Sequence, residues 1–305
     1  MRAFVFVFVL AGCGSQGGSG TLAMAASGES AAVDGYPSAT GVAFADGWSL
    51  DVDFVLMSVS AFYVAHGGAR VALPDADPVI LDLHDALLQD VWTFSGVPAR
   101  RYEDVGYQIA PPTSGARRIG TITQEQIDTM TAGGIAYWLH GTAHHPDHHD
   151  VTLDLRIPMH TSMSHCVNAM DMTDGLVVTP NGTAELQLTF HLDHVFFDSI
   201  VAAEPAIRFE AYAAAAGDDF VVTLDELASQ PLANLHDVDG SPLMEDGVQL
   251  FYDPGSTPLA VQDLRSFVYH QATTVGHFNG EGHCSYVCTD ASGATQPSCP
   301  APPTH

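Results

Sequence analysis

Glu185-Leu-Gln-Leu-Thr-Phe-His-Leu-Asp193 is the stretch of sequence that decides the fold class. Every second residue in it is apolar: Leu186, Leu188, Phe190 and Leu192. A period of two is typical of a β-strand that buries one face and leaves the other polar. The stretch therefore predicts a strand, with His191 and Asp193 two residues apart on its polar face and His194 at its end.

The same pattern extends through the first half of the chain. Strands are predicted over residues 51–57, 58–64, 79–83, 102–109, 135–142 and 151–157, with glycine, proline and aspartate between them. Many short strands separated by turns are typical of an antiparallel β-sandwich. We therefore expect a mainly β protein, with a β-sandwich domain over residues 42–195.

Residues 196–305 have a different character and contain helical patterns. One helix is predicted over residues 204–216, another from Thr223, and a third over residues 261–273. Thr223 and Glu226 have the spacing of a capping box. We expect a small helical insertion and a disulfide-pinned C-terminal segment that pack on the same domain.

The segment 204–229 resembles an EF-hand, in which a calcium-binding loop joins two helices. Glu226 would be the twelfth, bidentate ligand and Asp219 the fifth. The first and third positions, Ala215 and Gly217, carry no carboxylate. Because the calcium affinity of an EF-hand depends on the number of charged ligands in its loop, we expect a degenerate loop that binds calcium weakly at most.

The N-terminus has the anatomy of a bacterial lipoprotein signal. Arg2 precedes a short apolar run, Ala3 to Val9, and Leu10-Ala-Gly-Cys13 follows. The run is far shorter than the ~20 residues that span a bilayer, so we expect residues 1–12 to be a signal peptide and Cys13 to be lipidated. The two residues after Cys13 are not acidic, which favours the outer membrane or the cell surface.

Residues 13–41 are rich in glycine, serine and alanine. This composition buries little apolar surface, so we expect a flexible tether. The expected partner of the N-terminus is the membrane, through the lipid anchor. The folded part would then lie outside the cytoplasm.

Four further cysteines would lie in an oxidising compartment: Cys166, Cys284, Cys288 and Cys299. Two disulfides are the expected state there, and three pairings are open. A local bond between Cys284 and Cys288 would leave Cys166 to pair with Cys299. A thiolate metal site is the alternative use of the same residues.

The chain has no lysine, and nine arginines face 36 acidic residues, which gives a formal net charge of −27. Such a field repels nucleic acid and attracts cations. Without lysine, Schiff-base, Ser–Lys and Walker-type phosphate chemistry are excluded. Adaptation of the surface to high salt would produce the same composition, and the two explanations are compatible.

Sixteen histidines make metal binding the main functional expectation. The candidate ligands are His191, Asp193 and His194; His277, Glu281 and His283; and His144, His145, His148 and His149. Gly280 and Gly282 allow a tight turn that could bring the ligands at 277–283 onto one ion, although a disulfide alone would also explain such a turn. The segment 140–150 suits looser binding of Cu²⁺, Ni²⁺ or Zn²⁺, or is a polar turn between two strands.

A metal-dependent hydrolase is the third function that the histidines allow. Asp147 and His148 align with the His-x-His-x-Asp-His signature of metallo-β-lactamase-type hydrolases, but Ala143 occupies the first histidine position. The chain has neither a Gly-x-Ser-x-Gly nor a His-Glu-x-x-His motif. We therefore do not expect an enzyme.

Two resemblances bear on function. The lipoprotein signal, the acidic composition and three stretches are similar to uncharacterised lipoproteins of myxobacteria and their relatives: Asp193-His-Val-Phe-Phe-Asp198, Val222-Thr-Leu-Asp-Glu-Leu227 and His277-Phe-Asn-Gly-Glu-Gly-His-Cys284. The first half resembles the β-sandwich domain of methanobactin-partner-like copper proteins, in the stretches Phe54-Val-Leu-Met-Ser-Val59, Val79-Ile-Leu-Asp-Leu83 and Tyr102-Glu-Asp-Val-Gly-Tyr107. The second resemblance implies a copper-binding role outside the cytoplasm.

We therefore expect an outer-membrane or surface lipoprotein that binds a transition metal, copper or zinc, without catalysis. Its role would be acquisition, storage or delivery of the metal to a partner protein. The alternative is a structural or interaction module, such as a calcium-bridged adhesion module with a salt-adapted acidic surface.

Overall fold

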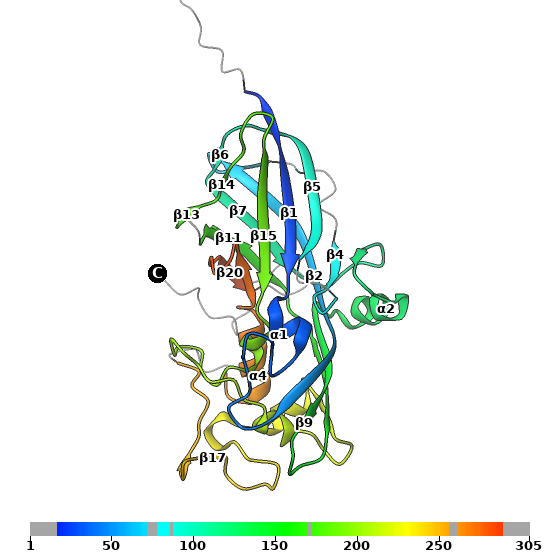
Figure 1. Cartoon of the computed structure of the whole chain (residues 1–305), viewed down its shortest axis with the longest axis vertical. Helices are drawn as coiled ribbons and strands as arrows, with labels where there is room; N and C mark the ends of the chain where they lie inside the picture. The colour runs from blue at the N-terminus through cyan, green and yellow to red at the C-terminus, as the bar shows by residue number, and fades with distance from the viewer. Residues whose placement is uncertain are drawn as a thin grey trace, which may run out of the picture.

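The structure is a computed structural model that describes residues 17–71, 73, 78–85, 88–169, 172–255 and 261–288. It is mainly β, as predicted, with several sheets and few helices. One main sheet has four strands in the order β19 (Gly276–Phe278), β15 (Thr183–Phe190), β1 (Ser19–Ser27) and β5 (Gln89–Pro98). In Figure 1, β15, β1 and β5 run side by side along the upper half of the molecule.

The second main sheet has ten strands. Its main path contains β16 (Val221–Thr223), β10 (Val151–Ile157), β9 (Tyr137–His144), β2 (Ser49–His66), β7 (Asp104–Ile109), β11 (Thr161–Ser164) and β20 (Ser285–Cys288). Three short strands extend it beside β2: β3 (Ala69–Val71), β4 (Val79–Asp82) and β8 (Arg117–Ile119). The two strands predicted at 51–57 and 58–64 are one continuous strand, β2, which pairs with β9, β4 and β7.

Six short strands form two-stranded sheets. The pairs are β6 (Arg101–Tyr102) with β14 (Leu176–Val177), β12 (Val167–Asn168) with β13 (Thr173–Asp174), and β17 (Met244–Glu245) with β18 (Val248–Gln249). Three strands after residue 196 enter the main sheets: β16 and β20 belong to the larger one and β19 to the smaller one. The C-terminal segment is therefore part of the same β body.

The helices are short. They are α1 (Glu29–Asp34), α2 (Gln124–Gly133), α3 (Glu210–Ala213) and α4 (Leu264–Ala272), with 3₁₀ turns η1 (Leu192–Phe196), η2 (Glu226–Ser229) and η3 (Leu232–Asn234). The helix predicted over 261–273 corresponds to α4. α2 was not predicted, although Thr123 and Gln126 form the reciprocal hydrogen bonds of a capping box at its start.

The helical insertion is smaller than predicted, and its EF-hand-like character is not confirmed. Of the helix predicted over 204–216, only the single turn α3 forms. The Glu226 carboxylate accepts hydrogen bonds from the Thr223 backbone N–H and hydroxyl at 2.8 and 3.1 Å. It therefore closes the start of η2 and does not face a calcium loop.

The decisive stretch forms β15, but the strand is shorter than predicted. Leu186, Leu188 and Phe190 are buried in the main hydrophobic core, as the alternation requires. The strand ends at Phe190, and His191 begins the turn into η1. The prediction that His191 and Asp193 share a strand face is therefore wrong, because the backbone leaves the sheet between them.

The tether predicted over residues 13–41 is wrong from Ser19 onward, and residues 13–16 lie outside the described part. β1 is a central strand, paired in parallel with β15 and antiparallel with β5. The side chains of its residues Leu22, Met24 and Ala26 are buried in the core. The small residues of this stretch make its alternation hard to recognise. Alanine and serine occur both in flexible tethers and in tightly packed strands.

The two main sheets share one hydrophobic core and are not purely antiparallel. Met24 of β1 and Leu188 of β15 belong to the same buried cluster as Val59 of β2 and Val105 of β7. Three strand pairs are parallel: β1 with β15, β10 with β16, and β4 with β8. The expectation of an antiparallel arrangement therefore does not hold at these pairs.

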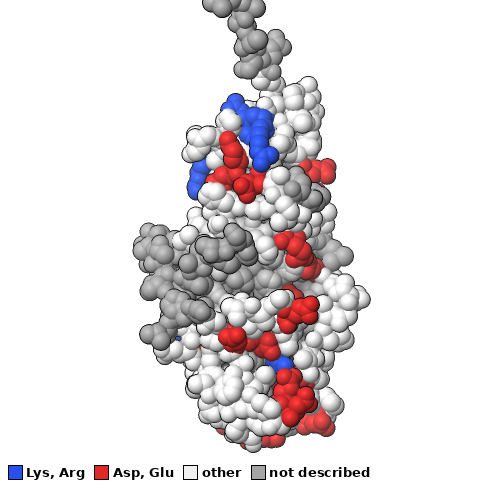
Figure 2. Space-filling view, turned by 90° about the vertical axis from the view of Figure 1, so that its left-hand side faces the viewer, with Lys and Arg blue, Asp and Glu red and all other residues white. Residues whose placement is uncertain are grey.

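The charges are unevenly distributed. On the face shown in Figure 2, most of the arginine atoms lie at the end where the chain enters β1, next to acidic side chains, and further acidic side chains extend down the molecule. The Ala99 N–H donates to the Gly18 carbonyl at 2.8 Å, so Arg100 and Arg101 lie near this end. Among the described helices, none is long and apolar enough to cross a membrane.

His270 gives the fold a predicted sensitivity to acid. It lies in α4 and is 2% exposed, and its burial lowers the pKa of the imidazole to about 4. The unfolded chain takes up a proton here near pH 6.5, whereas the folded chain does so only near pH 4. The free energy of unfolding therefore falls as the pH is lowered from about 6.5 to about 4, by up to ~3 kcal/mol for this residue.

We expect His270→Leu to reduce the fall in thermal midpoint between about pH 7 and pH 4.5, as followed by circular dichroism. His149→Leu, at an exposed histidine, is the matched control and should melt like the native chain at each pH. Parallel pH profiles for His270→Leu and the native chain would contradict the prediction.

Candidate metal centre

Four histidine rings converge where β15 ends and β19 begins. The ring centroids of His191 and His277 are 4.2 Å apart. His194 lies 5.2 Å from His191 and 5.3 Å from His277, and His283 lies 5.1 Å from His277. Rings from η1, from β19 and from the turn after β19 therefore meet in one place.

Strand pairing produces this convergence. β15 and β19 are antiparallel, with Thr189 opposite His277 and Phe190 opposite Gly276. Directly beyond this pair, the His191 N–H donates to the Val275 carbonyl at 2.9 Å. The chain then bends into η1, which brings both His191 and His194 against β19.

Three carboxylates surround the rings. Glu29 Oε2 lies 3.1 Å from His191 Nδ1, and Asp193 Oδ1 lies 3.9 Å from the same nitrogen. Glu281 Oε2 lies 3.5 Å from His191 Nε2 and 3.8 Å from His277 Nδ1. The Glu281 side chain is 72% exposed and His283 is also exposed, so these two residues form the solvent side of the cluster.

Glu29 is absent from the ligands predicted from the sequence, because the predicted tether has no defined structure. The parallel register of β1 and β15 places Ser27 opposite Thr189, so α1 begins beside the end of β15. The alternation of Leu22, Met24 and Ala26 is the signal that reveals β1 and, just beyond it, Glu29.

Burial dominates the electrostatics of the imidazoles. It lowers the pKa of His191 to about 4, with a contribution from His283. It lowers the pKa of His277 to about 4, and that of His194 well below its usual value, with contributions from the neighbouring rings. The three rings are therefore neutral at neutral pH, which is the form in which histidine binds metal ions.

The carboxylates shift in the opposite direction. Burial, together with the charges of Glu281 and Asp193, raises the pKa of Glu29 to about 7. Burial also raises the pKa of Asp193 to about 6, again with a contribution from Glu281. Both effects disfavour the charged form, since negative groups are held together away from water.

Two ring nitrogens in the cluster lack hydrogen bonds. Within the described part of the chain, His191 Nε2 and His277 Nδ1 are buried and have no hydrogen-bond partner. An unsatisfied buried polar atom costs about 1–3 kcal/mol. The ring of His194 is positioned by Thr274, whose Oγ1 lies 2.9 Å from Nδ1.

The arrangement could hold a metal ion in two ways. One ligand atom from each of His191, Asp193 and His194 lies within 4.8 Å of the others, and the same is true of His191, His277 and Glu281. The candidate ligands at 191–194 and 277–283, which are distant in the sequence, therefore lie in one cluster. Neither set contains a residue of the segment 140–150.

The histidines of the segment 140–150 have separate surroundings. His144 Nδ1 lies 2.8 Å from Asp150 Oδ1, at the end of β9. His145 and His148 stack on each other, with ring centroids 4.6 Å apart, and both contact Trp48. His149 packs against Phe220. These contacts match a polar turn between β9 and β10.

A disulfide anchors the turn that carries Glu281 and His283. Cys166 pairs with Cys284, 118 residues further along the chain. The local pair of Cys284 with Cys288, one of the three pairings left open, therefore does not form, because Cys284 is bonded to Cys166. Cys288 lies in β20, opposite Thr161 of β11. Cys299 lies outside the described residues.

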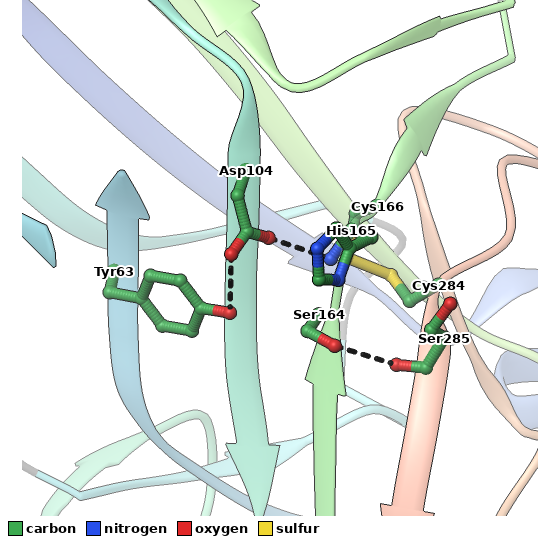
Figure 3. The surroundings of a disulfide bond; sticks show 7 residues. All are labelled: Tyr63, Asp104, Ser164, His165, Cys166, Cys284 and Ser285. Carbon is green, nitrogen blue, oxygen red and sulfur yellow. Dashed lines mark hydrogen bonds between the residues drawn. A yellow bond between two sulfur atoms is a disulfide. The ribbon is translucent and has the colours of Figure 1, made fainter. Parts of the chain in front are cut away.

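Hydrogen bonds hold both sides of the disulfide. Figure 3 shows Asp104 accepting bonds from the Tyr63 hydroxyl at 3.1 Å and from the His165 backbone N–H at 2.7 Å. On the other side, the Ser164 hydroxyl donates to the Ser285 carbonyl at 3.4 Å. Cys166 thus directly follows the hydrogen-bonded His165, and Cys284 directly precedes the hydrogen-bonded Ser285.

Gly282 allows the turn to close against the neighbouring backbone. A Cβ atom at this position would collide with the carbonyl oxygens of Val167 and Phe278. The Phe278 N–H donates to the Gly282 carbonyl at 2.8 Å, and the Val167 N–H donates to the His283 carbonyl at 2.9 Å. The glycine-rich sequence is therefore needed to bring His283 back toward His277.

Comparison of the chain with protein families, with curated proteins and with solved structures gives no match. Any function proposed for the cluster therefore rests on its own geometry.

We expect removal of the disulfide by Cys166→Ala with Cys284→Ala to lower the free energy of unfolding by about 3–5 kcal/mol, because the bond closes a long loop. Urea unfolding in the presence of a metal chelator measures this. Reductant should lower the stability of the native chain by a similar amount and leave the double variant unchanged. Equal stability of the two proteins without reductant would contradict the prediction.

Proposed function

We propose that this protein binds a transition metal, zinc or copper, at the cluster of His191, His194, His277, His283 and Glu281, without catalysis. The observation that carries the proposal is that His191 Nε2 and His277 Nδ1 are both buried without hydrogen-bond partners in the described part of the chain. Their rings are 4.2 Å apart. One cation between them would bind both lone pairs.

The chemistry of the donors favours Zn²⁺ and Cu²⁺. Imidazole nitrogen suits zinc and copper, and carboxylate oxygen also binds zinc. Because Cys166 and Cys284 are joined in a disulfide, the site offers nitrogen and oxygen and no thiolate from these two residues. Thr274 and Glu29 would orient His194 and His191, as hydrogen-bonding partners of metal-binding histidines commonly do.

We also propose that the protein is an outer-membrane or surface lipoprotein, anchored through Cys13, that acquires, stores or delivers the metal to a partner protein. The signal anatomy of residues 1–13 supports the anchor. The disulfide supports an oxidising compartment. The two main sheets would pack as a β-sandwich, a proposal supported by the core that they share.

We expect tag-free protein that is loaded with Zn²⁺ or Cu²⁺ and desalted to retain at least about one equivalent of metal, measured by elemental analysis. His191→Ala with His277→Ala should retain almost none, because it removes the two unpartnered nitrogens. Metal at ~100 times its dissociation constant should also stabilise the native fold by about 2.7 kcal/mol.

The matched control is the loop variant, in which His144, His145, His148 and His149 are all replaced by alanine. It should retain as much metal at the cluster as the native chain. Retention of less than about half an equivalent by the loop variant would contradict metal binding at the cluster.

A further inference from the structure

The cluster holds more ligand groups than one ion uses. Four imidazoles and three carboxylates lie in it: His191, His194, His277, His283, Glu29, Asp193 and Glu281. A protein-bound zinc ion takes four ligands in structural sites and three protein ligands in most catalytic sites. A single ion would therefore leave several of these groups unused.

The negative charge of the cluster has no basic counterpart. The arginine ion pairs of the described residues are with Asp154, Asp198, Glu245 and Asp225. None involves Glu29, Asp193 or Glu281. Buried charges in proteins are paired with opposite charges or bind metal ions, and a bound cation would neutralise these carboxylates.

The ligand groups divide between the two nitrogens of one ring. His191 Nδ1 faces Glu29 at 3.1 Å and Asp193 at 3.9 Å. His191 Nε2 faces Glu281 at 3.5 Å, and the same Glu281 oxygen is 3.8 Å from His277 Nδ1. The two nitrogens of an imidazole point away from each other, so these are two separate positions.

The two ligand sets that could each surround an ion have His191 in common and no other residue. One set is completed by Asp193 and His194, and the other by His277 and Glu281. In addition, Glu29 lies beside the first set and His283 beside the second. Each position thus has at least one histidine and one carboxylate of its own besides the shared ring.

We infer that the centre holds two divalent metal ions, one on each side of His191, with its imidazole as the bridge. This inference rests on the proposed metal binding and specifies how many ions bind and through which residues. On binding the second ion, His191 gives up its remaining N–H proton to solvent, and each ring nitrogen forms one metal bond.

The charges of such a centre balance. Two divalent ions carry four positive charges, and the three carboxylates with the bridging imidazolate carry four negative charges. A single ion with neutral His191 would leave one net negative charge on the three ionised carboxylates. Ions would reach the cluster from the side on which Glu281 is exposed to solvent.

The test counts copper and measures whether two copper ions interact. The loop variant is loaded with excess Cu²⁺ and desalted, so that the exposed histidines at 144–149 do not contribute. We expect about two equivalents of copper and an electron paramagnetic resonance spectrum weaker than that of two isolated ions, with a half-field transition. Two paramagnetic ions joined through one ring are coupled, whereas ions at distant sites are not.

Conservative variants test which residues form each of the two ion positions. Asp193→Asn should reduce the retained copper by about one equivalent and remove the coupling, because it changes only the Nδ1 side. Glu281→Gln should do the same on the Nε2 side. In His191→Ala the coupling should be lost because the bridge is absent.

The outcomes separate this inference from the proposed function. One equivalent of copper with an ordinary uncoupled spectrum would overturn the two-ion centre and leave metal binding standing. Two equivalents without coupling, unaffected by Asp193→Asn, would place the second ion elsewhere and also overturn it. Retention of no copper would overturn both proposals.

Discussion

The pairing of β15 with β19 is the constraint on which the candidate centre depends. It sets Thr189 opposite His277 and leaves His191 bonded through its backbone to Val275, one step beyond the last paired residue. Because the chain turns into η1 at this point, the rings of His191 and His194 approach His277 from the same side. A shift of one residue in this register would turn His277 to the other face of the sheet.

The cluster gathers seven titratable side chains in a partly buried place. Burial holds imidazoles neutral and raises the pKa values of Glu29 and Asp193, because carboxylates and rings are gathered away from water. The fold tolerates this arrangement because both ends are anchored. β1 leads into Glu29 from a central strand, and the disulfide at Cys284 holds the turn that carries Glu281 and His283.

Period-two alternation predicted β2, β4, β7, β9, β10 and β15, but the ten-residue strand β5 was not predicted. It failed where small residues conceal the pattern, as in β1, and where a short backbone turn interrupts it, as after Phe190. The ligands at 191–194 and 277–283 were recognisable as histidine-rich stretches. Glu29 was not, because its role depends on a parallel strand pair that joins positions distant in the sequence.

The sequence by itself determined the mainly β character, the buried face of β15 and the acidic, lysine-free chemistry, because these follow from local periodicity and composition. It also contained every residue type found in the candidate centre. Only the tertiary structure decided that His191 meets His277, that Cys166 pairs with Cys284, and that the histidines at 144–149 lie apart. These are long-range contacts, and their geometry is set by sheet register, which has no local signal. The glycines at 280 and 282 indicated a tight turn, but not that its backbone packs against Val167.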